Sequence, residues 1–82
     1  MRVVAFHQSA FEQFNQWARS DKKIFERLVR LIADTAKTPF TGIGKPEPLK
    51  YLASGAWSRR LTQEHRLVYL VSADRVDFLQ AC

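Results

Sequence analysis

The sequence lacks the features that mark secreted, membrane and metal-binding proteins. It holds one cysteine, Cys82, the last of its 82 residues, so no internal disulfide can form and a reducing compartment is expected. That cysteine and two histidines far apart in the chain do not make up a metal-ligand set. No apolar run approaches the ~20 residues that a membrane helix needs, and residues 1–6 are too short for the apolar part of a signal peptide. We therefore expect a cytoplasmic protein without metal, cofactor or membrane contact.

Acidic residues are scarce relative to basic ones. Eight Asp and Glu stand against 13 Lys and Arg, which gives a net charge of +5 and a pI of about 9.9. This balance favours a polyanionic partner, with nucleic acid the first candidate. Residues 1–82 are enough for a single domain, which excludes a Rossmann unit or a kinase. So small a domain without disulfides has a thin margin of stability, so a homodimer or a tightly bound partner is expected.

The first third of the chain reads as a strand followed by a helical hairpin. Residues 2–6 are rich in valine and predict a strand. Ser9 and Glu12 have the spacing of a capping box, and apolar residues then recur at helical intervals over 10–19. Asp21 is placed to cap a second helix, which should end near Lys37 because Pro39 disfavours helical dihedrals before it.

The rest of the chain predicts strands. After a loop rich in glycine and proline, alternating residues and short turns indicate a short strand at 49–52 and longer ones at 57–62, 66–71 and 75–80. The fold class is therefore α+β: a strand, a two-helix hairpin, then a three-stranded antiparallel meander with the helices on one face.

Positive charge gathers in the second half of the chain. Five basic residues lie between positions 45 and 66, against only Glu47 and Glu64; they are Lys45, Lys50, Arg59, Arg60 and Arg66. Arg60 and Arg66 converge if the turn at 63–65 pairs their strands in register, and converging guanidinium groups suit phosphate. The alternative is that the arginines are solvated residues of a strand face, paired with Glu64 or Asp74.

Two other residues in this region are candidates for chemistry. Glu47 lies between two prolines amid cations, so its carboxylate is a candidate general base; the alternative is a surface glutamate that neutralises Lys45 or Lys50. His65 adjoins Arg66 and is a candidate for phosphate binding, although a structural role is the more common one. Trp57 either packs in the core or stacks on bases.

The central motifs identify a family. Residues 38–50, 54–62 and 64–69 resemble the YoeB toxins of the RelE/ParE superfamily, and the resemblance covers nearly the whole chain. It implies a RelE-like microbial RNase fold and a ribosome-dependent mRNA interferase of a type II toxin–antitoxin system. In this family the 2′-hydroxyl of mRNA in the ribosomal A site attacks the adjacent phosphate, without a metal.

The resemblance assigns roles residue by residue. Glu47 matches the general base and Arg66 the arginine that stabilises the phosphorane, while Lys50 and Arg60 match basic residues that line the site. With the residues singled out above, the expected catalytic set is Glu47, Arg66 and Lys50. The expected RNA- and phosphate-binding residues are Lys45, Arg59, Arg60 and His65.

Partners and one departure also follow from the resemblance. We expect a YefM-like antitoxin with a disordered acidic segment, a ribosome with bound mRNA, and a homodimer. Family members carry a Tyr-His-Tyr tail with the proposed general-acid histidine, whereas this chain stops at Cys82. Its activity should be reduced accordingly. The alternative reading is a catalytically silent module that binds ribosome and antitoxin; a ParE-like gyrase poison has less support because Glu47 and Arg66 belong to the nuclease branch.

Overall fold

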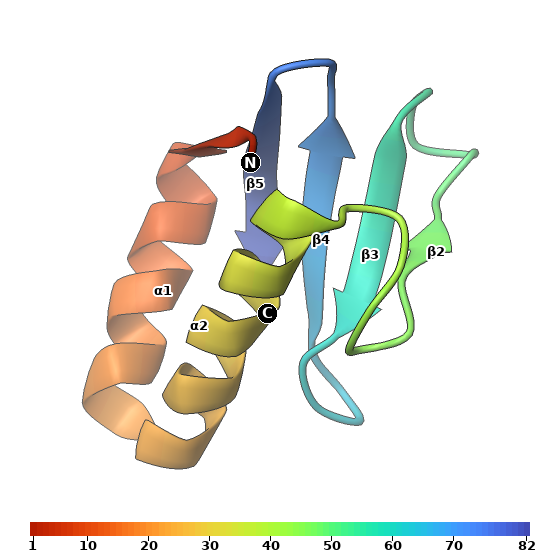
Figure 1. Cartoon of the computed structure of the whole chain (residues 1–82). Coiled ribbons are helices and arrows are strands. Elements are labelled where there is room, and N and C mark those ends of the chain that lie inside the picture. The colour runs from red at the N-terminus through yellow and green to blue at the C-terminus, as the bar shows by residue number, and fades with distance from the viewer.

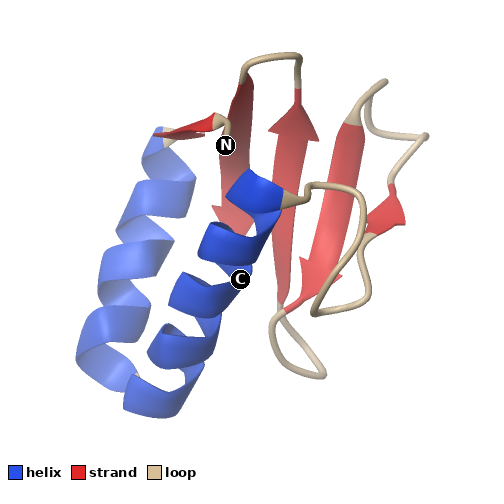
Figure 2. Cartoon of the chain, in the orientation of Figure 1, coloured by secondary structure: helices blue, strands red, loops and turns tan.

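Two helices cover one face of a five-stranded sheet in the computed structural model, which describes residues 1–82 (Figures 1 and 2). The strand order is β1-β5-β4-β3-β2, with β1 parallel to β5 and every other neighbouring pair antiparallel. The predicted α+β class and the antiparallel meander β3–β4–β5 are confirmed. In chain order the elements are β1 (Val3–Phe6), α1 (Gln8–Ser20), α2 (Lys22–Lys37), β2 (Glu47–Pro48), β3 (Ala56–Arg60), β4 (Arg66–Val71) and β5 (Arg75–Ala81).

The start of α1 differs from the prediction. The helix begins at Gln8, and its preceding residue His7 provides no side-chain cap. Ser9 Oγ donates instead to the carbonyl of Leu79 on β5 at 3.0 Å, so the predicted capping box with Glu12 is wrong. The serine hydroxyl therefore fastens α1 to the sheet rather than closing the first helical turn.

The second helix follows its prediction closely. Asp21 accepts a hydrogen bond from the backbone N–H of Ile24 at 3.1 Å, which is the expected N-cap. The helix ends at Lys37, two residues before Pro39, as expected.

The short strand β2 lies earlier than predicted. The sequence pattern indicated 49–52, but the paired residues are Glu47 and Pro48, opposite Ser58 and Trp57 of β3. The chain then turns back, with the N–H of Leu52 donating to the carbonyl of Leu49 at 3.0 Å. A proline has no N–H for a ladder, which restricts it to a sheet edge, and β2 is an edge strand.

The core lies between the helices and the inward face of the sheet. Strand alternation places Tyr69 and Phe78 on that face, with ring centroids 6.0 Å apart and no exposed surface. The fully buried residues that pack with them include Ala10, Leu28, Leu31, Leu67 and Val76. No helix of this structure combines the length and apolar character needed to cross a bilayer.

The opposite face of the sheet carries no helix, and we call it the open face (Figure 2). The β3–β4 register pairs Ser58 with Val68 and Arg60 with Arg66, and alternation points these four side chains away from the helices. Glu47 pairs with Ser58 and so lies in the same row. Polar and charged groups of three neighbouring strands thus share one surface.

Candidate active site on the open face of the sheet

An ion pair between β2 and the start of β4 lies on the open face. Arg66 Nη1 donates to Glu47 Oε1 at 3.0 Å and lies 3.5 Å from Ser58 Oγ. Both side chains are about half exposed, Arg66 at 43% and Glu47 at 57%. An ion pair this exposed contributes about 0–1 kcal/mol to stability. The two groups are therefore available to a ligand at little energetic cost to the fold.

Two hollows flank this pair and share both of its members. The Ser58 hollow, of about 450 Å³, is lined by residues that include Tyr51, Ser58, Gln80 and Cys82. The Lys45 hollow, of about 390 Å³, is lined by Lys45, Arg60 and the two prolines around Glu47. The pair thus lies between two hollows, with Lys45 and Arg60 on the side of the Lys45 hollow.

The structure brings four of the predicted site residues together. Glu47, Arg66, Arg60 and Lys45 all line the Lys45 hollow, and the expected alignment of Arg60 with Arg66 is confirmed. Lys50 is exposed in the turn after β2 and lines neither hollow. Lys50 therefore does not line the site of the Glu47–Arg66 pair, and its predicted catalytic role has no support from its position.

Lys45 has an unusual backbone. Its φ is 51°, in the left-handed region that a side chain with a Cβ seldom adopts. The preceding Gly44 carbonyl accepts a hydrogen bond from the N–H of Arg60 at 2.7 Å, which holds this segment against β3. Strain of this kind persists where surrounding contacts enforce it, and such positions cluster at functional sites.

Arg59 corrects one prediction. It was expected to bind phosphate, but its side chain is fully buried on the helix side of the sheet. A guanidinium group has five N–H donors, and all five are used within the protein. Nε donates to the hydroxyl of Tyr69 at 3.1 Å and Nη1 to Asp34 Oδ2 at 2.6 Å. The remaining bonds go to the carbonyls of Ile43 (3.1 Å), Thr38 (2.6 Å) and Thr41 (2.9 Å).

This buried network shifts the titration of its members. The hydrogen bond from Arg59 is the main reason that the pKa of Asp34 lies below its usual value, with burial opposing it. Burial raises the pKa of Tyr69, against the effect of the Arg59 hydrogen bond. The Tyr69 hydroxyl in turn donates to the carbonyl of Pro39 at 2.8 Å. Arg59 is thus a structural residue that ties the loop after α2 to the sheet.

The same network explains a glycine. Gly42 has a φ of 119°, and a Cβ at this position would clash with Asp34 Oδ2. Asp34 also accepts from the N–H of Ile43 at 3.0 Å. Hydrogen bonds from Arg59 and to Asp34 therefore hold the loop in place just before Lys45 and Glu47, which lie on the open face.

His65 is the second correction. It lies in the turn between β3 and β4 and lines neither the Ser58 nor the Lys45 hollow. Its ring packs edge-on against Trp17 of α1, with centroids 5.0 Å apart and an interplanar angle of 75°. Alternation turns it to the helix side while its neighbour Arg66 faces the open side. The expected contact of His65 with a phosphate at the pair is not supported.

Most residues of the Ser58 hollow were not among the predicted site residues. Ser58, Tyr51 and Gln80 line it, and Tyr51 is 87% exposed. Ser58 shares the period-two alternation of Arg60, and this signal was present in the sequence. Nothing in the local sequence marks Tyr51, in the turn after β2, or Gln80, in β5, as a residue of this hollow. No group of three or more His, Cys, Asp or Glu side chains is arranged to hold a metal ion.

Fold and site together define a class, the small toxins of bacterial toxin–antitoxin systems. The structure matches the YoeB/ParE toxin from Agrobacterium tumefaciens with a TM-score of 0.90 and 41% identity, over 99% of this chain and 95% of that one. It matches the YoeB dimer from Staphylococcus aureus (TM-score 0.89, 33% identity, 98% and 93% coverage). It also matches a heterotetrameric YoeB-YefM toxin-antitoxin complex from that organism (0.87, 33%, 99% and 94%).

Sequence comparison narrows the class to one family. The family described as YoeB-like toxin of bacterial type II toxin-antitoxin system matches residues 6–82. The toxin YoeB of Streptomyces coelicolor is 49% identical over 78 residues, which cover 95% of this chain and 93% of that protein. The chain belongs to the YoeB-like toxins, as its central motifs predicted.

Proposed function

We propose that this chain is a ribosome-dependent endoribonuclease that cleaves translated mRNA in the ribosomal A site. The observation that carries the proposal is the Glu47–Arg66 pair, 3.0 Å apart on the open face with Lys45 and Arg60 beside it. A carboxylate and a guanidinium group in contact supply a base for a hydroxyl and a stabilising cation for phosphate.

The pair acts in two steps. In the free protein each group occupies the other, and the exposed bond between them is cheap to break. A phosphate of bound RNA takes over the donors of Arg66, which frees the carboxylate of Glu47. That carboxylate then accepts the proton of the adjacent 2′-hydroxyl.

The chemistry follows from that arrangement. The 2′-oxygen attacks phosphorus and the bond to the 5′-oxygen breaks, which leaves a 2′,3′-cyclic phosphate and a 5′-hydroxyl. Arg66 and Arg60 stabilise the charge that develops on the phosphorane. The 5′-oxygen takes its proton from a general acid, which in the family is the tail histidine. Residues 1–82 contain no Tyr-His-Tyr segment, and loss of a positioned general acid lowers a cleavage rate by about 10²- to 10⁴-fold.

Primer extension on mRNA paused on programmed ribosomes tests the proposal. The 82-residue chain is compared with the same chain extended by a Tyr-His-Tyr tail, and new 5′ ends at the A-site codon are expected from the extended chain. Glu47→Gln and Arg66→Ala should each lower the yield of these ends by about 10²-fold or more. Glu26→Gln and Arg30→Ala make the same charge changes on exposed positions of α2 and should have no effect. Unchanged cleavage by Glu47→Gln refutes the mechanism.

A second candidate is a catalytically silent module that binds ribosome and antitoxin. It predicts co-sedimentation with ribosomes without new mRNA ends from either form. Ends at the A site from the extended chain would count against it.

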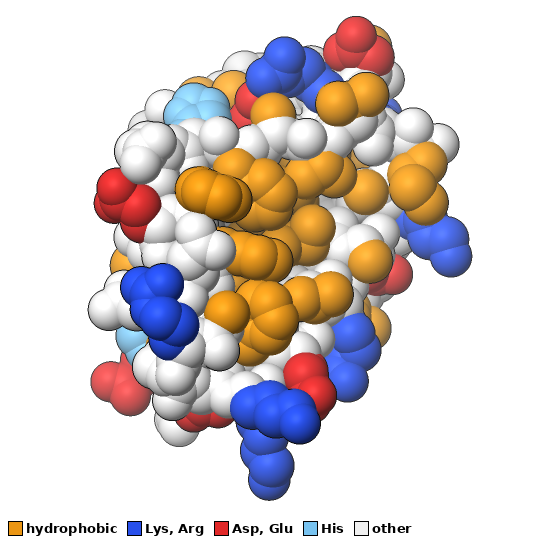
Figure 3. All heavy atoms as spheres, turned by 90° about the vertical axis from the view of Figure 1, so that its left-hand side faces the viewer, with side chains coloured by type: hydrophobic (Ala, Val, Ile, Leu, Met, Phe, Trp, Pro, Cys, Tyr) orange, Lys and Arg blue, Asp and Glu red, His pale blue; other side chains and the backbone are white.

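A YefM-like antitoxin and a second copy of the chain are the partners that accompany this function, as in the two S. aureus structures. The +5 charge attracts an acidic antitoxin segment. Seen from the side where α1 lies, apolar side chains gather in a broad patch with charged groups at its rim (Figure 3). Contiguous exposed apolar side chains rimmed by charged groups are typical of an interaction surface. Antitoxin affinity should fall as salt rises, because part of the attraction is electrostatic; affinity that does not change with salt would contradict this account.

A further inference from the structure

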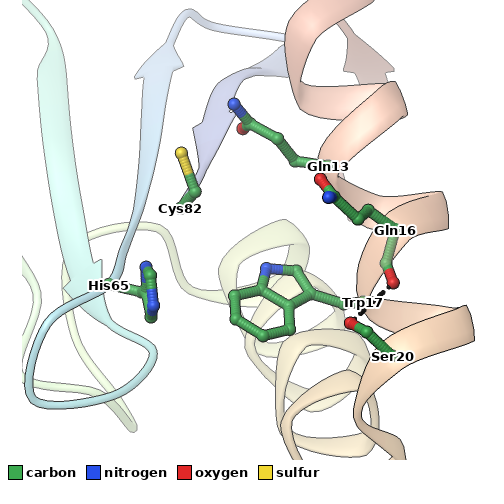
Figure 4. Close-up of a pocket in the computed structure, with 6 residues that line it drawn as sticks. All are labelled: Gln13, Gln16, Trp17, Ser20, His65 and Cys82. Carbon is green, nitrogen blue, oxygen red and sulfur yellow. Dashed lines mark hydrogen bonds between the residues drawn. The ribbon is translucent and has the colours of Figure 1, made fainter.

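A third hollow lies on the helix side of the sheet, between α1, the β3–β4 turn and the end of β5. It has a volume of about 210 Å³, and we call it the Trp17 hollow (Figure 4). Trp17 stands in its middle, with His65 and Cys82 on one side and three polar residues of α1 on the other. The three are Gln13, Gln16 and Ser20.

Hydrogen bonds fix part of the lining of the Trp17 hollow. Trp17 Nε1 donates to the carbonyl of Ala81 at 2.7 Å, and Gln13 Oε1 accepts from the N–H of the same residue at 2.7 Å. Both bonds join α1 to the last residue of β5, so the indole plane and the Gln13 amide have fixed orientations. A preorganised wall loses little conformational entropy when a ligand binds.

Other polar groups of the hollow have no partner within the protein. The side-chain amide of Gln16 and the ring nitrogens of His65 make no protein hydrogen bond, and Gln13 keeps its NH₂ group free. The available groups are therefore donors and acceptors arranged around an aromatic surface. An apolar side chain of a protein partner leaves such groups unsatisfied, which costs free energy.

We propose that the Trp17 hollow binds one nucleobase of the RNA strand whose phosphate contacts Arg66. An aromatic surface with amide donors and acceptors at its rim is how proteins hold an unstacked base of single-stranded RNA. Glutamine amides both donate and accept, so they can bond to the edge of a base.

Continuity with the candidate active site supports this ligand. Cys82 lines both the Trp17 hollow and the Ser58 hollow, which holds Glu47 and Arg66. His65 and Arg66 are adjacent in the chain and point to opposite faces of the sheet end. The proposed strand, with its phosphate at Arg66, passes around that end of the sheet and places another nucleotide in the Trp17 hollow. The inference rests on the proposed function and adds a subsite that reads a base next to the cleaved bond.

The test uses RNA pentamers with a 2′-O-methyl group at the central nucleotide, which blocks cleavage. Fluorescence anisotropy measures binding of a full pentamer and of versions with one abasic position each. Removing a base that stacks on an aromatic side chain should weaken binding by about 5- to 150-fold. We expect this loss at one position flanking the centre. The full pentamer should also shift the indole N–H resonance of Trp17, one of two tryptophans in the chain, and the matching abasic pentamer should not.

A matched pair of variants connects the base to the hollow. Gln16→Ala should weaken binding of the full pentamer several-fold and leave the abasic pentamer unaffected. Gln8→Ala removes another exposed glutamine of α1, one that does not line the hollow, and should change neither. Neither variant removes a core side chain, so both should fold.

Three results overturn the inference. One is equal binding of the full pentamer and every abasic version, and another is equal behaviour of Gln16→Ala and Gln8→Ala. The third is a Trp17 resonance that responds to an acidic apolar peptide and not to RNA, which makes the hollow a partner site. Arg66→Ala separates this failure from that of the proposed function. If it weakens all pentamers while abasic positions do not matter, only the base subsite is wrong; if it changes neither binding nor cleavage on ribosomes, the proposed function is wrong.

Discussion

Replacing Arg59 by methionine should destabilise the protein far more than the same change at its neighbour. Methionine retains most of the aliphatic volume but removes five hydrogen-bond donors from a fully buried site. Asp34 is left as a carboxylate without its cation, and Tyr69 loses one partner. Removing one member of a buried ion pair costs about 3–5 kcal/mol. Because the side chain of Asp34 is itself 30% exposed, we expect a loss of about 3 kcal/mol, near the lower bound.

That loss is large relative to the whole stability of the chain. A domain of 82 residues has a free energy of unfolding of about 4–12 kcal/mol at the usual 0.05–0.15 kcal/mol per residue. The Arg59→Met variant should therefore unfold at a temperature lower by about 12 °C or more. Arg59→Lys retains the charge but not the planar set of donors, so its loss should be intermediate.

Urea unfolding followed by circular dichroism measures the effect. Arg60→Met is the control, because Arg60 is exposed on the same strand and its loss should change the free energy of unfolding by no more than about 0.5 kcal/mol.

The pH dependence of this stability loss has a definite sign. Since the folded pKa of Asp34 lies below its ordinary 3.8, the contribution of the pair is complete above that pH and is lost as pH falls through the lower folded value. The difference between wild type and Arg59→Met should narrow accordingly. Equal losses for Arg59→Met and Arg60→Met, or a difference independent of pH, would refute this reasoning.

Three further substitutions test the loop and a helix cap by chemical unfolding. Gly42→Ala should cost at least about 2 kcal/mol, because φ is 119° and the new Cβ meets Asp34 Oδ2. Lys45→Gly should raise stability by up to about 1 kcal/mol by relieving a φ of 51°, yet weaken RNA binding in the anisotropy assay; a less stable variant would show that this backbone is not strained. Asp21→Ala should cost about 1 kcal/mol through the lost bond to Ile24, and a loss near zero would contradict that.

Local patterns in the sequence were enough for the helices and the meander. Apolar periodicity predicts both helices, and Asp21 and Pro39 mark where the second helix begins and ends. The alignment of Arg60 with Arg66 followed from strand alternation and a short turn. Each of these features depends on residues close together in the chain.

Long-range pairings were beyond such reasoning. Nothing near Val3 indicates that it pairs in parallel with Arg75, and nothing near Pro48 indicates that it lies opposite Trp57. The Ser9 hydroxyl is another example, because it forms a hydrogen bond to the distant Leu79 carbonyl instead of the local capping box. Tertiary contacts decide these positions.

For Arg59 the sequence did contain a signal. Arg59 lies two residues from both Trp57 and Leu61, so the three side chains share one face of the strand, and that face is the buried one. Its positive charge suggested a phosphate ligand, whereas its place between two large apolar residues indicated burial. The sequence does not show that Asp34, on another element, pairs with Arg59 and offsets the free-energy cost of burying its charge.

The pairing of β1 with β5 also determines the order in which the chain assembles during synthesis. β1 leaves the ribosome first, but its only neighbour in the sheet, which begins at Arg75, is made last. Until then the helical hairpin can form while the first strand has nothing to pair with, and the backbone bond from Arg66 to the carbonyl of Cys82 is absent too. For a protein proposed to cut mRNA on ribosomes, this means that the sheet is complete only after β5 has left the ribosome.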